Sequence, residues 1–210
     1  ALGFLDECTG LVDYIACHKK SEATTARLRY ESNHARHGKV KLYRLDNAKE
    51  FTGTAFEADI IAAGIGLEFS APNAHHQLYM ERAWRSTMTI ARAMMRHADL
   101  PKPFWSYALG VAFYLRNHVI SGARSASPIE LVTGRAPNIG ILRVFGCTAY
   151  ANIPCDHNPA LADTSVKGIF VGYSARSNTW LIYNPVSKRI LHTNAATFDE
   201  TSFIGRHIVG

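Results

Sequence analysis

Hydrophobic and polar positions in the first 70 residues switch repeatedly between a strand-like and a helix-like period. Short apolar runs typical of strands lie at residues 11–18, 39–45 and 65–70. Helix-like segments lie between them at residues 21–37 and 54–64. Gly38 follows the first of these segments, at a position where glycine commonly ends a helix. Strands interleaved with helices predict an α/β (α+β) layered domain.

The clearest helix is predicted between about Tyr79 and His97. Its apolar residues recur at intervals of four, three and four, which predicts one buried stripe: Trp84, Met88, Ala91 and Met95. A neighbouring face carries one acid and three arginines: Glu81, Arg85, Arg92 and Arg96. An ordinary solvated face explains this row. The functional alternative is a carboxylate that binds metal, beside guanidinium groups that bind phosphates.

A change of pattern near residue 140 predicts a second domain. Before it, residues 104–119 have a helical period, and Ser127-Pro128-Ile129-Glu130 is a capping box that opens a short helix ending at Gly134. After it come strand-like runs at residues 142–153, 168–173, 179–183, 189–192 and 196–198. Short strands with frequent turns predict a small barrel or sandwich. We therefore expect one domain over residues 1–137 and another over residues 138–210.

Positive charge is concentrated in the middle of the chain. The 210 residues carry a net charge of +6, with a pI near 9.2. Residues 82–143 hold nine Lys and Arg and two acids, a net of +7, which leaves the remainder at −1. Such clustering favours an anionic partner such as nucleic acid, although an ordinary basic surface stays open as the alternative. The apolar runs are far shorter than a membrane span, so no membrane partner is expected.

The cysteines give no sign of a metal or disulfide framework. Cys8, Cys17, Cys147 and Cys155 include no C-x-x-C pair and no zinc-ligand spacing. We expect reduced thiols in a cytosolic or nuclear protein. The chain opens directly on the apolar run before Asp6 and lacks an initial Met, so we expect it to be part of a longer protein.

Three acidic residues occupy positions that can form a metal site. Asp6 follows the run Leu2–Leu5, Asp46 ends the strand-like run at residues 39–45, and Glu81 opens the long helix. Taken singly, an acid at a strand end or in the first turn of a helix is usually a solvated or capping group. Together, three carboxylates can hold two hard divalent cations, which stabilise the attacking and leaving oxygens in phosphoryl transfer.

Ten short sequence motifs occur in the same order as in one known family. They are Leu45–Phe51 (LDNAKEF), Gly64-Ile65, Ser70-Ala71-Pro72, Glu81–Arg85 (ERAWR), Phe104–Ala108 (FWSYA), Arg116-Asn117, Ser127–Leu131 (SPIEL), Leu142–Cys147 (LRVFGC), Gly168–Tyr173 (GIFVGY) and Phe198–Glu200 (FDE). The chain resembles the integrase segment of copia-type retrotransposon polyproteins over nearly its whole length.

The resemblance implies an RNase H-like mixed sheet flanked by helices, followed by a small SH3-like β-barrel. It implies an Asp, Asp, Glu triad that falls on Asp6, Asp46 and Glu81, with 34 residues between the last two. These residues would be both catalytic and metal-binding, with Asp6 and Asp46 at adjacent strand positions and Glu81 facing them. The implied cofactor is a pair of Mg²⁺ (or Mn²⁺) ions. The implied partners are double-stranded DNA, from the ends of the retrotransposon and from the target, and further copies of the protein. The implied location is the nucleus, after a cytoplasmic particle stage.

The segments next to two members of the triad, after Asp46 and before Glu81, depart from the family pattern. Asn47-Ala48-Lys49-Glu50 replaces the usual Asn-Gly-Gly-Glu, and Ala74–Leu78 (AHHQL) replaces a Pro-Gln-Gln-Asn-Gly loop. The enzymatic hypothesis is a polynucleotidyl transferase that processes 3′ ends and transfers strands. Its alternatives are a catalytically decayed remnant that binds nucleic acid, and a general RNase H-type nuclease. In the first two hypotheses the residues that grip DNA phosphates are Arg82, Arg85, Arg92 and Arg96. Those arginines could instead cover the core or pair with nearby acids such as Asp99.

Overall fold

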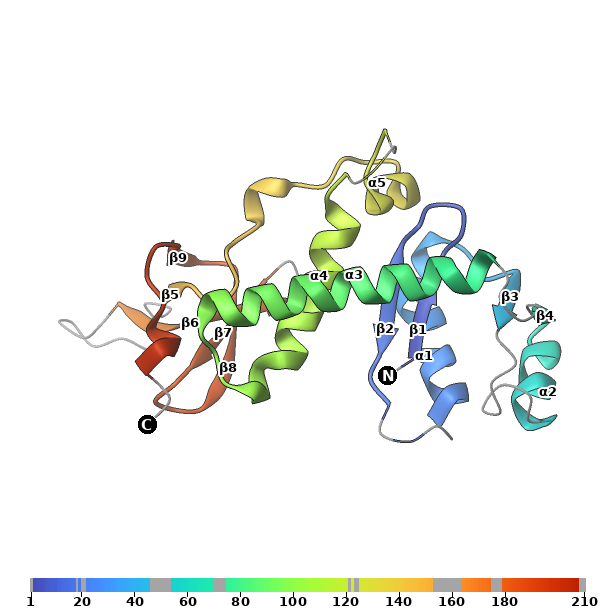
Figure 1. The fold of residues 1–210 in the computed structure, drawn as a ribbon, viewed down its shortest axis with the longest axis horizontal. Coiled ribbons are helices and arrows are strands. Elements are labelled where there is room, and N and C mark those ends of the chain that lie inside the picture. The colour runs from blue at the N-terminus through green and yellow to red at the C-terminus, as the bar shows by residue number, and fades with distance from the viewer. Residues whose placement is uncertain are drawn as a thin grey trace. The chain divides into compact units, whose positions relative to one another are not determined.

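Figure 1 shows the chain as a computed structural model. The structure describes residues 2–17, 19, 22–45, 54–69, 75–120, 122, 125–152, 164–174 and 179–207. It describes side chains for all of these except residues 54, 75–78, 206 and 207.

Strands and helices alternate in the first part of the chain, and strands follow one another in the last part. The strands are β1 (Leu2–Leu5), β2 (Val12–Ile15), β3 (Leu42–Leu45), β4 (Gly66–Phe69), β5 (Thr148–Asn152), β6 (Ser165–Tyr173), β7 (Trp180–Asn184), β8 (Arg189–Thr193) and β9 (Ala196–Asp199). The helices are α1 (Ala23–His34), α2 (Thr54–Ala62), α3 (His75–Ala98), α4 (Trp105–His118) and α5 (Pro128–Thr133). The α/β class predicted from the sequence is confirmed.

The chain packs as two units, each made of two stretches of sequence. The first unit contains Ala1–Ser86 and Ile120–Pro137, and the second contains Thr87–Val119 and Asn138–Gly210. In the second unit the strands β5–β9 are grouped with α4 and with the last turns of α3. The domain boundary expected after residue 137 stays a prediction.

Two short pairs of strands share one core in the first unit. β1 and β2 are antiparallel, with Leu2 opposite Ile15, and β3 and β4 are parallel. Helix α1 packs on β1 and β2, and α2 packs on β4. Ala23, Phe56 and Ile60 form the buried centre, and Leu2, Tyr43, Leu45, Ile65 and Leu67 pack against it. Apolar side chains therefore join the two strand pairs, although within the described residues their backbones are not hydrogen-bonded to each other.

Helix α3 is longer than the sequence predicts. It begins at His75 rather than near Tyr79, because the polar residues before Tyr79 show no apolar period that would reveal a helix. The buried positions also differ from the predicted stripe: they are Ala83, Thr87, Ala91 and Ala98, whereas Trp84, Met88 and Met95 are half-buried. Small residues thus occupy the centre of the buried face, and the large side chains lie at its margins.

The second unit contains a five-stranded antiparallel sheet in the order β8-β7-β6-β5-β9. Its core consists of Cys147, Ala149, Ala151, Phe170 and Ile182. The register shifts between Phe170 and Gly172, and such a bulge bends a strand and increases its twist. A strand was predicted in each of these five positions, and the turn at Asn184 joins β7 to β8 as expected.

The strand predicted from Leu142 was placed too early, because β5 begins only at Thr148. The preceding segment is tied to the sheet by side chains instead of by a strand ladder. The backbone N–H of Arg143 donates to the hydroxyl of Tyr173 at 2.9 Å. The indole N–H of Trp180 donates to the carbonyl of Ile141 at 3.0 Å. Side chains of β6 and β7 therefore provide the hydrogen-bond partners of these backbone groups. We call this segment before β5, residues 141–147, the strap.

The capping signal before α5 is confirmed. The hydroxyl of Ser127 accepts a hydrogen bond from the backbone N–H of Glu130 at 3.3 Å, and Pro128 is the first helical residue. Gly134 follows the helix with a φ of 69°, in the left-handed region that glycine adopts without steric cost.

Candidate functional site

Asp6 closes the turn between β1 and β2. Its backbone N–H donates to the carbonyl of Leu11 at 2.8 Å, and its carbonyl accepts from the N–H of Gly10 at 2.7 Å. Its carboxylate accepts from the N–H of Cys8 at 3.4 Å, from the N–H of Thr9 at 3.3 Å and from the hydroxyl of Thr9. The structure therefore gives Asp6 a local role, which is to cap the turn that follows its strand.

The Asp6 carboxylate retains some capacity for a further ligand. Both bonds from Thr9 reach Oδ2, and only the longer bond from Cys8 reaches Oδ1. An ionised carboxylate offers about four lone-pair sites, so one position on Oδ1 remains. The carboxylate also lies close enough to Tyr30 to act on it. Burial raises the pKa of Tyr30 to about 12, and the charges of Asp6 and Asp13 add to this effect.

Glu81 lies on the part of α3 that packs against β1. A Cβ atom added at Gly3 of β1 would lie 2.2 Å from Cε of Met80 and 3.5 Å from the ring of Trp84. A residue without a side chain at position 3 thus lets the helix approach the strand closely. Glu81 stands next to Met80 in α3, and its own side chain is exposed. The helix that carries Glu81 and the strand that leads to Asp6 are therefore direct neighbours.

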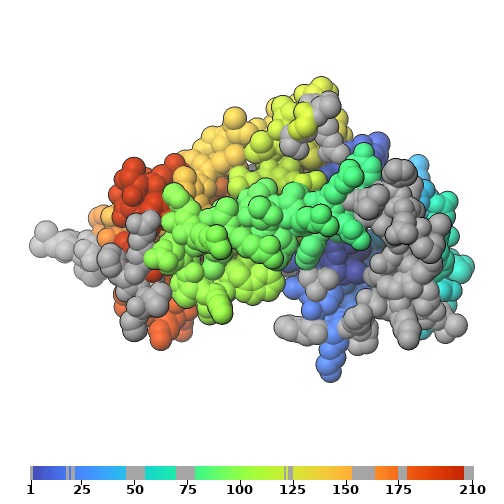
Figure 2. All heavy atoms as spheres, in the orientation of Figure 1, coloured from blue at the N-terminus to red at the C-terminus, as the bar shows by residue number. Residues whose placement is uncertain are grey.

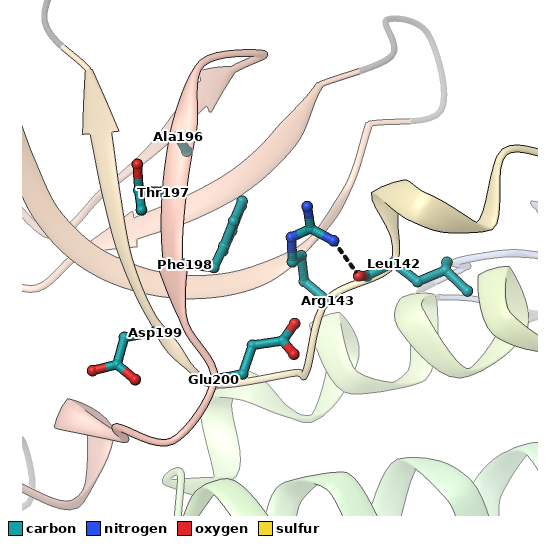
Figure 3. Close-up of a pocket in the computed structure, with 7 residues that line it drawn as sticks. All are labelled: Leu142, Arg143, Ala196, Thr197, Phe198, Asp199 and Glu200. Atoms are coloured by element: carbon teal, nitrogen blue, oxygen red, sulfur yellow. Dashed lines mark hydrogen bonds between the residues drawn. The ribbon is translucent and has the colours of Figure 1, made fainter.

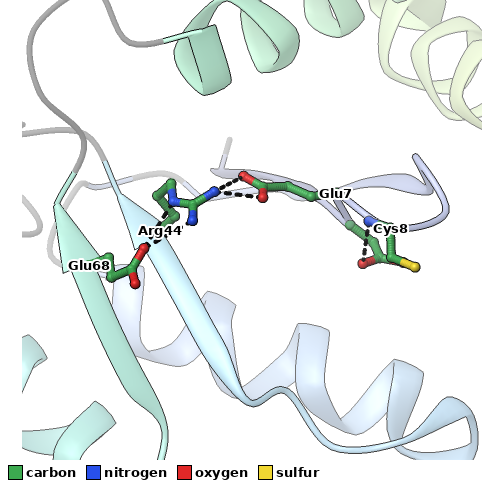
Figure 4. A network of polar contacts seen from close by, with 5 residues as sticks. Glu7, Cys8, Arg44 and Glu68 are labelled. Carbon is green, nitrogen blue, oxygen red and sulfur yellow. Dashed lines mark hydrogen bonds and ion pairs between the residues drawn. The ribbon is translucent and has the colours of Figure 1, made fainter.

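Asp46 lies outside the described residues, so its predicted position beside Asp6 stays a prediction. The strand that leads to it, β3, ends at Leu45. Arg44 in this strand is held by acids on two sides (Figure 4). Its Nη1 donates to both carboxylate oxygens of Glu7, at 2.8 and 2.6 Å. Its Nε and Nη2 donate to Oε2 of Glu68, at 3.1 and 3.0 Å.

This arrangement was not predicted from the sequence. Glu7 follows Asp6, and Arg44 precedes Asp46 by two residues, so both lie next to predicted site residues. The signal that could have revealed Arg44 is a cation inside a short strand, two positions before a candidate metal ligand. The hydrogen bonds that the Arg44 guanidinium donates to Glu7 and to Glu68 raise its pKa, so the group stays charged.

The donor set has the chemistry of a hard-cation site. Mg²⁺ prefers oxygen ligands and is commonly bound through carboxylates. Asp6 and Glu81 both supply such oxygens on neighbouring elements. Within the described part of the chain no group of three metal-ligating side chains is gathered. The predicted third ligand, Asp46, is not in that part.

The predicted arginine row is exposed along α3. Arg82, Arg85, Arg92 and Arg96 all have exposed side chains, as does Glu81. Figure 2 shows α3, in green, uncovered over most of its length on the viewed face. Among the described residues no ion pair joins Arg92 or Arg96 to Asp99. The row is thus accessible to an anionic partner.

A groove of about 530 Å³ lies on the barrel between β9 and the strap before β5 (Figure 3). Phe198 of β9 and Glu200, which follows β9, lie on the side that faces Arg143 of the strap, and Thr197 and Asp199 lie on the other side. The Arg143 guanidinium lies 5.7 Å from the ring centre of Trp180 and 5.1 Å from that of Phe198. Its Nη1 donates to the carbonyls of Gly140 and Leu142. These contacts hold Arg143 in the wall of the barrel.

The described part of the chain contains no helix that is both long and apolar enough to cross a membrane.

The fold is that of the integrases. The catalytic core domain of BIV integrase matches 63% of this chain and 84% of its own chain, with a TM-score of 0.50 and 21% identity. The simian T-cell lymphotropic virus intasome, solved in complex with PP2A regulatory subunit B56 gamma, matches 94% of this chain and 68% of its own, with a TM-score of 0.52 and 18% identity. At these identities the likeness shows the fold alone, an RNase H-like core followed by an SH3-like domain, as predicted.

Sequence comparison then relates the chain to retrotransposon Pol polyproteins. Residues 147–208 match the retroviral polymerase SH3-like domain family. The Retrovirus-related Pol polyprotein from transposon TNT 1-94 of Nicotiana tabacum is 33% identical over 78% of this chain. That from transposon RE1 of Arabidopsis thaliana is 30% identical over 79%. The chain spans only 12% and 11% of these two polyproteins. The predicted resemblance to the integrase segment of copia-type polyproteins is confirmed.

Proposed function

We propose that the chain is the part of a retrotransposon integrase that processes the 3′ ends of the element and joins them to target DNA. The observation that carries this proposal is the contact between α3 and β1 at Gly3. It brings the helix with Glu81 against β1, the strand that Asp6 follows. The same helix exposes the arginine row, so a carboxylate and cations suited to phosphate groups lie on one element.

In this proposal Asp6, Asp46 and Glu81 hold two Mg²⁺ ions. When bound, such ions activate water for end processing and a 3′-hydroxyl for joining, and they stabilise the leaving oxygen. The protein residues do the positioning. Asp6 contributes Oδ1, because Oδ2 is engaged by Thr9. Glu81 contributes an exposed carboxylate from a helix that packing fixes against β1.

The DNA partner is argued from the charges of α3. Arg82, Arg85, Arg92 and Arg96 are exposed guanidinium groups, which form bidentate hydrogen bonds with phosphates. Phosphate contacts carry no sequence information directly, which suits a protein that joins DNA ends to varied targets. Assembly of several copies on DNA and action in the nucleus belong to the same proposal.

Strand transfer by the full-length protein tests the proposal. The assay uses duplex DNA with the ends of the element and Mg²⁺, and compares the wild type with Asp46→Asn and Glu81→Gln. We expect both variants to lose at least about 100-fold in activity, because each removes a charged metal ligand. Asp59→Asn, at an exposed acid of α2, is the matched control and should retain activity. Unchanged activity in Asp46→Asn or Glu81→Gln would reject the assignment.

A second function is favoured by the bonds of Asp6. Because its carboxylate already caps the β1–β2 turn, Asp6 has a structural reason to be acidic without any metal. The corresponding function is a catalytically inactive protein that binds DNA through α3. Such a protein binds duplex with a strong salt dependence and no effect of Mg²⁺. Metal-dependent nicking at element ends would exclude it.

A further inference from the structure

We propose that Arg44 is the positioning residue of the carboxylate site. Held by Glu7 and Glu68, it fixes the strand that leads to Asp46 against the strand end that carries Asp6. This inference rests on the proposed function, because it concerns the same three carboxylates. It adds residues that neither touch the metals nor belong to the triad.

The contact with Glu68 fixes the direction of the Arg44 side chain. Arg44 in β3 lies directly opposite Glu68 in the parallel strand β4. Both Nε and Nη2 donate to Oε2 of Glu68. Two donors on one acceptor define the plane of the guanidinium, so the remaining Nη1 points away from β4. Figure 4 shows it directed toward the β1–β2 turn.

The contact with Glu7 then joins two separate pairs of strands. Within the described residues β1–β2 and β3–β4 are not hydrogen-bonded to one another. An isolated pair of strands is only marginally stable in water, so links between pairs decide their relative position. The apolar core provides one such link, but apolar contacts are not directional. Nη1 of Arg44, bonded to both oxygens of Glu7, adds a directional link.

The ends of this link are adjacent to the proposed metal ligands. Glu7 is covalently next to Asp6, and Arg44 is two residues before Asp46. A displacement of β3 relative to the β1–β2 turn would therefore change the separation of the two aspartates, and shared metal ions require a fixed separation.

Removal of Arg44 should change metal affinity in opposite directions, depending on whether Arg44 acts only through its charge or by positioning the ligands. The role is therefore testable. Arg44 is a positive charge close to carboxylates that bind cations. If charge alone mattered, its removal would strengthen metal binding, because a repulsive charge is lost. If Arg44 holds the ligands in place, its removal weakens metal binding. Outer groups that orient metal ligands typically contribute a factor of about 10 to 100 in affinity.

The experiment measures binding of Mn²⁺ to this chain by electron paramagnetic resonance. It compares the wild type with Arg44→Gln and Arg44→Lys, and circular dichroism shows whether each variant is folded. We expect about tenfold weaker binding for Arg44→Gln. Arg44→Lys keeps the positive charge but not the planar guanidinium group, so its Mn²⁺ affinity should lie between those of the wild type and Arg44→Gln. Arg189→Gln, at an exposed arginine of β8, removes a charge elsewhere and should bind as the wild type does.

Each outcome decides a different part of the inference. Equal or tighter Mn²⁺ binding by Arg44→Gln would overturn the positioning role and leave the metal site intact. Should Arg44→Gln fail to fold, Arg44→Lys decides alone, because a pure charge effect predicts no change in that variant. A wild type that binds no Mn²⁺ would overturn the proposed metal site, and the role of Arg44 with it.

Discussion

The rings of Tyr114 in α4 and Tyr173 in β6 stack with centroids 4.0 Å apart and planes inclined by 17°. The stack continues in both directions. His118 lies 3.8 Å from Tyr114 on one side, and Phe170 meets Tyr173 edge-on at 5.2 Å on the other. This column of rings runs from the helix into the core of the β-sheet, so α4 contributes to the stability of the sheet.

Removal of the central ring should destabilise the second unit. Tyr114→Ala deletes a half-buried ring that touches two others, and we expect a loss of roughly 2 kcal/mol in the free energy of unfolding. Denaturant unfolding of the wild type and the variant measures this difference. Tyr79→Ala, at a tyrosine that is 63% exposed, is the control and should stay within about 0.5 kcal/mol. Equal stability of Tyr114→Ala and wild type would show that the stack contributes nothing.

His118 should make the stability of the protein depend on pH. Burial lowers the pKa of His118, and its bond to the carbonyl of Tyr114 opposes this effect only in part. The unfolded state, with a pKa near 6.5, therefore binds more protons than the folded state as pH falls. The contribution of His118 is complete above the unfolded pKa and is lost as pH falls toward the folded pKa.

The measurement is the melting temperature between pH 7 and pH 5.5. His118→Phe keeps an aromatic ring in the stack and cannot titrate. We expect the wild type to lose more stability than this variant over the interval, because other titrating groups, including His37, affect both proteins equally. Parallel curves for the two proteins would contradict the prediction.

Local signals in the sequence were sufficient for much of the fold. The turn at Asn184 and the helix start at Ser127 were predicted because each depends on a few neighbouring residues. The strap before β5 was not predicted. The side chains that bond to its backbone, those of Tyr173 and Trp180, lie 30 and 39 residues away in sequence from their partners. An apolar run alone does not distinguish a strand from a segment held by distant side chains.

In the candidate site, too, features that depend on neighbouring residues were predictable and contacts with distant residues were not. Glu81 was predicted on the helical face next to the buried stripe, because helical periodicity is a local property, and the structure leaves its side chain exposed. The contacts of Arg44 were not predicted, because Glu7 and Glu68 lie 37 and 24 residues away. The turn-capping bonds of Asp6 were within reach of prediction, since Thr9 is only three residues on. The position of Asp6 after an apolar run was interpreted as that of a metal ligand instead.

The cap of α5 should contribute measurably to stability. The hydroxyl of Ser127, whose residue is 1% exposed, accepts from the N–H of Glu130. Ser127→Ala leaves this N–H without its partner, and we expect a loss of about 1 kcal/mol in the free energy of unfolding. Ser127→Thr keeps the hydroxyl and should retain most of the stability. If the two variants prove equally destabilised, the loss comes from packing and not from the cap.

The arginine row of α3 gives the last prediction. Arg92 is exposed and, within the described residues, forms no ion pair with Asp99. If it binds a DNA phosphate, Arg92→Ala should weaken binding similarly for unrelated duplex sequences. It should also lower the slope of log affinity against log salt by about one, because one fewer counterion is released. Folding should be nearly unchanged, since exposed substitutions usually cost less than about 0.5 kcal/mol.

Fluorescence anisotropy at several salt concentrations measures both quantities, and Arg189→Ala on β8 is the matched control for loss of one exposed arginine. If Arg92→Ala and Arg189→Ala lower the slope equally, the effect is one of net charge and α3 has no special place in binding. If neither changes the slope, Arg92 serves only to cover the margin of the buried face, where its aliphatic stem can shield apolar side chains. A change confined to Arg92→Ala assigns the phosphate contact to α3, the same helix that carries Glu81 against β1.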